Sequence, residues 1–119
     1  MNIKEAFKQV RDCFSPKIIG EINDVYVKIV RINGDEVPWH KHEREDEFFY
    51  VIEGNLLFEM EGKKSFTMNE GDFFVVKRGI VHRVSSTEEC KVLLVENKMT
   101  LHTGNVKTEI TKTIEEQLI

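Results

Sequence analysis

The sequence lacks most features of secreted, membrane-spanning and nucleic-acid-binding proteins. It has only two cysteines, Cys13 and Cys90, whose spacing forms no metal-binding pair and which favour no disulfide in a cytosolic chain. No apolar run approaches the roughly 20 residues that cross a bilayer. The first residues, Met1 to Phe7, contain no hydrophobic signal segment. We therefore expect a cytoplasmic protein without a membrane partner.

Clustered positive charge is also missing. The 17 Lys and Arg residues are scattered among 21 Asp and Glu residues, and the net charge is −4. Proteins that bind nucleic acids usually gather basic residues on one face or in one run, so we expect no nucleic-acid partner. The 119 residues, 40% of them hydrophobic, suffice for one domain with a modest core. We find no linker, internal repeat or low-complexity segment.

The N-terminal segment, residues 1–16, predicts a helix packed on the outside of the main fold. Between residues 3 and 14, apolar side chains recur at helical spacing. Asn2 with Glu5 three residues later is an N-terminal capping signal, and Pro16 ends the pattern. The apolar stripe consists of Ile3, Phe7, Val10 and Phe14.

From residue 17 onward the hydrophobic period is two, which is typical of strands. Short strands separated by glycine-bearing turns predict an all-β sandwich or barrel that forms one domain over residues 17–119. We expect a polar loop at 85–89, and one further strand and a short helical turn within 99–119. The expected strands cover 17–21, 25–32, a stretch beginning near Val37, 47–52, 56–60, 65–68, 73–76, 81–84 and 91–96.

Three histidines and one glutamate carry the chemistry. His40 and His42 are one residue apart, and on a strand both imidazoles would point to the same side. Glu47 follows five residues later, and a barrel could bring His82 opposite the pair. Imidazole and carboxylate suit zinc, iron, nickel and manganese. Coordination positions left open for water or substrate are typical of a catalytic rather than a structural metal site.

These residues resemble the paired motifs of the cupin family. The first motif, residues 34–54, is matched at every spacing by Gly34, His40, His42, Glu47 and Gly54. The second motif, residues 71–86, is matched by Gly71, Gly79 and His82, with Lys77 in place of its proline and Ser86 in place of its asparagine.

The resemblance implies a double-stranded β-helix, or jelly-roll barrel, with a short N-terminal helix. It also implies one divalent transition-metal ion (zinc, iron, nickel or manganese) inside the barrel, bound by His40, His42, Glu47 and His82. Small cupins are commonly homodimers. The face of strand 47–52 away from the metal is also apolar, so we expect the helix, the other sheet or a second subunit to cover it.

The resemblance leaves several functions open. One is a metal-dependent enzyme acting on a small polar molecule such as a sugar or sugar acid, in the manner of an isomerase. Another is an iron dioxygenase, and a third is a non-catalytic module that binds a small molecule. With Glu47 bound to the metal, no general base is evident, so catalytic residues are not assigned. His102 lies outside both motifs, and we expect it on a surface or loop without a functional role.

Overall fold

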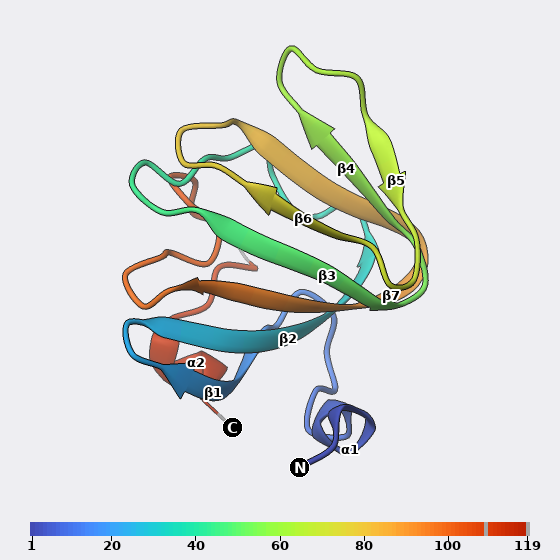
Figure 1. Cartoon of the computed structure of the whole chain (residues 1–119), viewed down its shortest axis with the longest axis vertical. Coiled ribbons are helices and arrows are strands. Elements are labelled where there is room, and N and C mark those ends of the chain that lie inside the picture. The colour runs from blue at the N-terminus through green and yellow to red at the C-terminus, as the bar shows by residue number, and fades with distance from the viewer. Residues whose placement is uncertain (109, 119) are drawn as a thin grey trace.

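Two antiparallel sheets that share one long strand make up most of the structure (Figure 1). This computed structural model describes residues 1–108 and 110–118. The larger sheet has the order β1-β2-β7-β3-β6, and β4 pairs with both β5 and β7. The elements are α1 (Ile3–Phe7), β1 (Lys17–Ile22), β2 (Val25–Gly34), β3 (Glu47–Glu53), β4 (Leu56–Met60), β5 (Phe66–Met68), β6 (Phe73–Val76), β7 (His82–Asn97) and α2 (Ile114–Gln117).

Strand β7 belongs to both sheets. Its first residues pair with β4, and its last residues pair with β2 and β3. The polar loop predicted at 85–89 is therefore wrong. Ser86 is buried, and its hydroxyl donates to the backbone oxygen of Ile32 at 3.0 Å, so the strand continues with its other polar side chains turned to solvent.

The core lies between the two sheets and confirms the predicted inward faces. On β3, Glu47, Phe49 and Val51 are buried, whereas the residues between them are more exposed. Phe58 of β4 has no exposed surface and stands edge-on to Phe49, with ring centroids 5.2 Å apart. Other core residues are Val30, Ile32, Leu56, Met68, Val76, Val84, Cys90, Val92 and Leu94.

The N-terminal helix is present but much shorter than the apolar stripe. It ends at Phe7, and the chain then turns sharply, with Phe14 at φ 57°. Arg31 explains the early end, because its guanidinium donates to the backbone oxygens of Phe7 and Val10 at 3.0 and 2.6 Å. Phe7 and Val10 pack against Ile29 on the outside of β2, as predicted for the helix, whereas Phe14 enters the core.

Residues 98–108 and 110–118 run over one end of the barrel (Figure 1) rather than adding the predicted strand. Among the described residues here, strand-like pairing is limited to a single bridge between Leu118 and Ile18. The predicted helical turn is confirmed as α2, which begins with a capping box at Thr113. The parts of residues 99–119 that fall on Glu109 and Ile119 lie outside the described residues. Across 1–108 and 110–118, we find no helix with the length and apolar content that a membrane crossing requires.

Candidate metal centre

His40 and His42 lie on an irregular segment rather than on the strand expected to begin near Val37. A single bridge replaces that strand: His40 N donates to His82 O at 3.0 Å, and His82 N donates to His40 O at 2.8 Å. His42 is held by a third backbone hydrogen bond, in which its carbonyl oxygen accepts from Gly79 N at 2.8 Å. The turn before β7 therefore places all three histidines.

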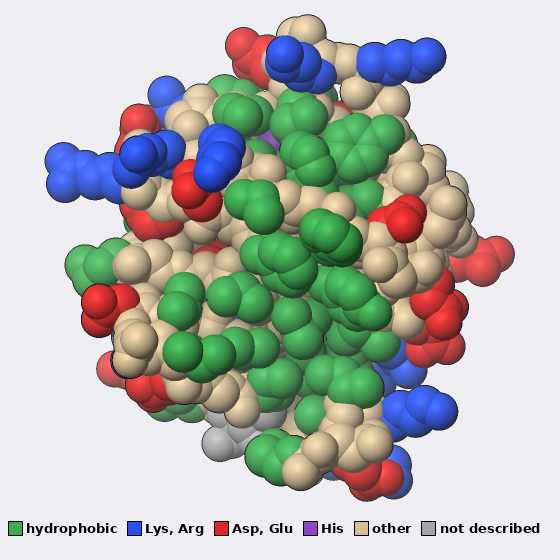
Figure 2. All heavy atoms as spheres, in the orientation of Figure 1, with side chains coloured by type: hydrophobic (Ala, Val, Ile, Leu, Met, Phe, Trp, Pro, Cys, Tyr) green, Lys and Arg blue, Asp and Glu red, His purple; other side chains and the backbone are tan. Residues whose placement is uncertain are grey.

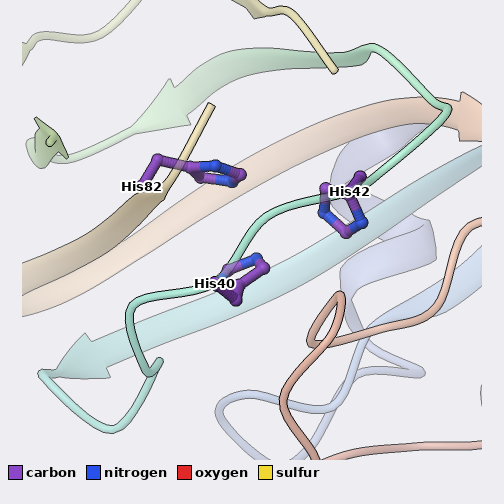
Figure 3. A group of neighbouring side chains, drawn as sticks. All are labelled: His40, His42 and His82. Carbon is purple, nitrogen blue, oxygen red and sulfur yellow. The ribbon is translucent and has the colours of Figure 1, made fainter. Parts of the chain in front are cut away.

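The three imidazoles converge inside the barrel (Figure 3). One ring nitrogen from each of His40, His42 and His82 lies within 4.8 Å of the others. The exposed fractions of His40, His42 and His82 are only 6%, 4% and 1%. The group therefore has the spacing and the seclusion to hold a metal ion.

Backbone carbonyls orient two of the rings. Nδ1 of His40 lies 2.7 Å from Pro38 O, and Nδ1 of His82 lies 2.9 Å from Ile80 O. A carbonyl only accepts hydrogen bonds, so both Nδ1 atoms carry the proton and both Nε2 atoms present a lone pair. Burial lowers the pKa of His40 to about 4, which keeps this imidazole in the neutral form that binds metals.

Glu47 faces the same space from β3. Its Oε1 lies 3.3 Å from His42 Nε2 and 3.7 Å from His82 Nε2. None of these three buried atoms has a hydrogen-bond partner among the described residues. Burial raises the pKa of Glu47, but contacts with His42, His82 and Glu96 outweigh it, so the pKa lies well below its usual range. An ionised carboxylate is costly to bury without a positive charge beside it. A metal ion bound by the imidazole nitrogens would supply that charge, so the residues present fit a metal ion.

Glu96 adjoins Glu47, and Lys28 adjoins Glu96; both residues are buried, and the sequence interpretation assigned neither. Glu96 pairs directly opposite Glu47 across β3 and β7, and Lys28 Nζ lies 2.7 Å from Glu96 Oε1. Burial and the neighbouring Glu47 raise the pKa of Glu96 well above its ordinary value, so Glu96 keeps its proton while Glu47 is ionised. The alternation of β7, in which Val92 and Leu94 point inward, was the signal for Glu96.

A small cavity of about 50 Å³ lies beside His40 and Glu47. Its polar lining comes from His40, Glu47, Thr103 and His102. His102 does lie on a loop, as predicted, but its side chain forms part of the cavity wall. The other lining residues are apolar: Phe14, Pro16, Val30, Ile32, Val37, Phe49, Val84 and Leu94.

Comparison with known proteins agrees with this geometry. A family model described as a cupin domain matches residues 28–96. The chain is 32% identical to the uncharacterized protein YdbB of Bacillus subtilis over 97 residues, 82% of this chain and 85% of YdbB.

Solved structures are similar as well. A cupin-2 domain containing protein from Shewanella frigidimarina has 32% identity and a TM-score of 0.78, over 82% of this chain and 94% of that one. A candidate mannose-6-phosphate isomerase from Ralstonia eutropha has 25% identity and a TM-score of 0.60, over 69% of this chain and 82% of that one. Family model, relatives, sheet topology and histidine cluster agree: the chain belongs to the cupin family.

Proposed function

We propose that His40, His42, Glu47 and His82 bind one divalent transition-metal ion, and that the protein is a metal-dependent enzyme acting on a small oxygen-containing molecule. The observation that carries the proposal is the buried Glu47 carboxylate, which faces unpartnered His42 and His82 Nε2 atoms at 3.3 and 3.7 Å. A metal ion between these atoms would supply the positive charge that the buried carboxylate requires.

The chain's own residues fix the ligands, exclude water and shape the substrate cavity. Pro38 and Ile80 carbonyls orient two imidazoles, and apolar side chains form most of the cavity wall. A bound metal ion would supply Lewis acidity toward an oxygen of the substrate. Such a cavity fits a compact substrate with an oxygen-rich head and a short apolar flank, for example a small hydroxy- or keto-acid.

Isomerase-like chemistry on a sugar or sugar acid is the first candidate reaction. The similarity to a candidate mannose-6-phosphate isomerase supports it, whereas the few polar groups of the cavity favour a small sugar-derived acid over a complete sugar. Iron-dependent dioxygenation and non-catalytic ligand binding use the same centre and remain the alternatives.

Metal analysis of protein purified without metal supplementation tests the centre. We expect about one ion per chain in the wild type, and loss of that ion in His82→Ala. Lys77→Ala, at a side chain that is 70% exposed on the turn before β7, is the matched control and should keep the metal. Metal near zero in the wild type, unchanged by His82→Ala, would contradict the proposal.

The identity of the metal and a substrate panel separate the three functions. Iron would favour oxygen chemistry, whereas zinc, nickel or manganese would favour an isomerase or a binding module. Hydroxy-acids, keto-acids and sugar phosphates should then be screened by thermal shift and assayed for turnover. Stabilisation without turnover by any compound of the panel would support the non-catalytic alternative.

We also propose that two copies associate through the outer face of the larger sheet. Figure 2 shows a broad hydrophobic surface over this sheet. On it Phe73 is 68% and Val75 41% exposed, and Phe73 stacks on Phe48 with centroids 6.0 Å apart. Light scattering should give twice the 13.9 kDa chain mass. Phe73→Glu should give a monomer, and Met99→Glu, 79% exposed in the wild type on the C-terminal segment, should not.

A further inference from the structure

The C-terminal strap, defined here as residues 98–108 and 110–118, closes one side of the cavity beside the metal centre. Two backbone-linked contacts tie it to the histidine segment: Lys41 N donates to Asn105 Oδ1 at 3.0 Å, and Asn105 N donates to Lys41 O at 3.1 Å. At its far end, the buried Lys28 donates to Gln117 Oε1 at 2.5 Å. The strap therefore has one fixed position on the barrel, and in Figure 3 it passes beside His40.

This position sets the orientation and the tautomer of His102. The backbone N–H of Lys112 donates to His102 Nδ1 at 2.8 Å. An amide N–H only donates, so Nδ1 accepts and the proton of the neutral ring is on Nε2. The Lys112 carbonyl is held in turn by Gln117 Nε2 at 3.0 Å. Ring flipping of His102 would break this arrangement.

His102 lines the cavity together with His40 and Glu47, and it also borders a second pocket formed by residues of the strap. Its Nδ1 is directed toward the strap, and we find no partner for its Nε2 within residues 1–108 and 110–118. Burial, followed by the nearby Lys28, lowers the pKa of His102 to about 4. The ring is therefore a neutral donor on the cavity wall.

We propose that His102 contacts the substrate: its Nε2–H donates a hydrogen bond to one oxygen of a small ligand that binds the metal ion through a neighbouring oxygen. The inference rests on the proposed metal centre and narrows its substrate class. Two adjacent oxygens, as in a 2-keto acid, a 2-hydroxy acid or a hydroxyketone, satisfy the ion and His102 together. The apolar wall, which includes Val84 and Leu94, takes a short hydrocarbon flank.

A neutral imidazole donor suits chemistry in which negative charge develops on the substrate oxygen. Such a donor, already oriented by Lys112, stabilises the developing charge without having to reorganise. In this role His102 acts only as a hydrogen-bond donor, so its ring does not have to be ionised. His102 thus supplies a polar group on the substrate side of the cavity that the two sequence motifs do not contain.

The experiment uses the zinc-loaded protein and acetohydroxamate, a small ligand with two adjacent oxygens and one methyl group. His102→Phe keeps the ring and removes the donor, and we expect the Kd for acetohydroxamate to rise about tenfold. His102→Gln keeps an N–H near the Nε2 position and should stay within about threefold of the wild type. Lys107→Ala, at an exposed residue of the same strap, is the matched control, and its Kd should not change.

Zinc titration of the same proteins separates this inference from the proposed function. Unchanged zinc binding in His102→Phe with weaker acetohydroxamate binding supports the role of His102. If His102→Phe binds both zinc and acetohydroxamate as the wild type does, the proposed role of His102 is overturned. Failure of the wild type to bind zinc, or of its zinc form to bind acetohydroxamate, would overturn the proposed open metal centre first, and the inference with it.

Nitrogen NMR of the wild type gives an answer that does not depend on any variant. Long-range proton–nitrogen spectra of zinc-loaded, ¹⁵N-histidine-labelled protein should show His102 protonated on Nε2, with Nδ1 as the acceptor. Acetohydroxamate should shift the His102 Nε2 resonance more than that of Nδ1. Protonation on Nδ1, or no response of Nε2 to bound acetohydroxamate, contradicts the proposal.

Discussion

Gly104 lies where the C-terminal strap meets His40 of the candidate metal centre, and substituting it with alanine tests that junction. The residue has φ +59°, and a Cβ atom there would overlap the backbone oxygen of Lys41 and lie 2.7 Å from Cδ2 of His40. A backbone oxygen cannot change rotamer, and the His40 ring is fixed by Pro38. In Gly104→Ala the strap itself therefore has to move.

The expected loss of stability has two parts. An alanine in this left-handed conformation costs about 1 kcal/mol. Movement of the strap also breaks the two hydrogen bonds between Lys41 and Asn105, each contributing about 1 kcal/mol. We expect Gly104→Ala to reduce the free energy of unfolding by about 3 kcal/mol. Gly62→Ala is the control: Gly62 has φ +74°, but a Cβ atom added to it would have no neighbouring atom within 4 Å, so only the backbone cost of about 1 kcal/mol applies.

Urea unfolding followed by circular dichroism, on metal-free protein, measures both losses. Zinc titration provides the second readout: because the strap moves while Pro38 keeps the His40 ring in place, Gly104→Ala and Gly62→Ala should both bind zinc with the affinity of the wild type. Equal losses of stability in the two variants, or weaker zinc binding in Gly104→Ala, would show that the strap does not meet His40 as described.

Two other predictions concern buried ionisable groups. Lys28→Met leaves the protonated Glu96 and the Gln117 side-chain carbonyl without their donor. Each buried acceptor left unsatisfied should cost about 1–3 kcal/mol of unfolding free energy, against about 0.5 kcal/mol or less in total for the exposed Lys77→Met; similar urea midpoints for both variants would contradict this. The pKa of His102 is about 4 in the folded protein against the ordinary 6.5, so the unfolded chain binds the proton first and stability falls as pH drops from 6.5 toward 4. His102→Gln should therefore lose up to about 3 kcal/mol less than the wild type between pH 7 and pH 4, and parallel pH profiles of metal-free protein would argue against a buried neutral His102.

The sequence predicted the parts of the site that depend on local spacing. His40, His42 and His82 have motif spacings within two short segments, and alternation along β3 correctly turned Glu47 inward. What could not be predicted depends on distant contacts. The helix ends at Phe7, whose backbone carbonyl accepts a hydrogen bond from Arg31, 24 residues further along the chain. The segment before His42 needs no strand because the bridge to His82 replaces it.

His102 could not be assigned from the sequence for the same reason. Its neighbours in the chain, Leu101 and Thr103, belong to no periodic pattern, so a loop was the correct local prediction. Its place on the cavity wall results from the docking of the strap, which depends on the Lys28–Gln117 contact across 89 residues of sequence. A single sequence shows local patterns, and this contact joins a strand in the barrel to a segment with little regular structure.

Stability alone does not account for Lys28, because a buried charged residue with polar partners is often no more stabilising than well-packed apolar residues of similar volume. Its contacts offer a positional reason. Lys28 holds the carbonyl of the Gln117 side chain, the amide of that side chain holds the Lys112 carbonyl, and the Lys112 N–H holds His102. On its other side, Lys28 contacts Glu96. The same buried ammonium group therefore contacts both the carboxyl neighbour of the metal centre and the strap that presents His102, and apolar side chains, which pack without directional bonds, would not fix that relation.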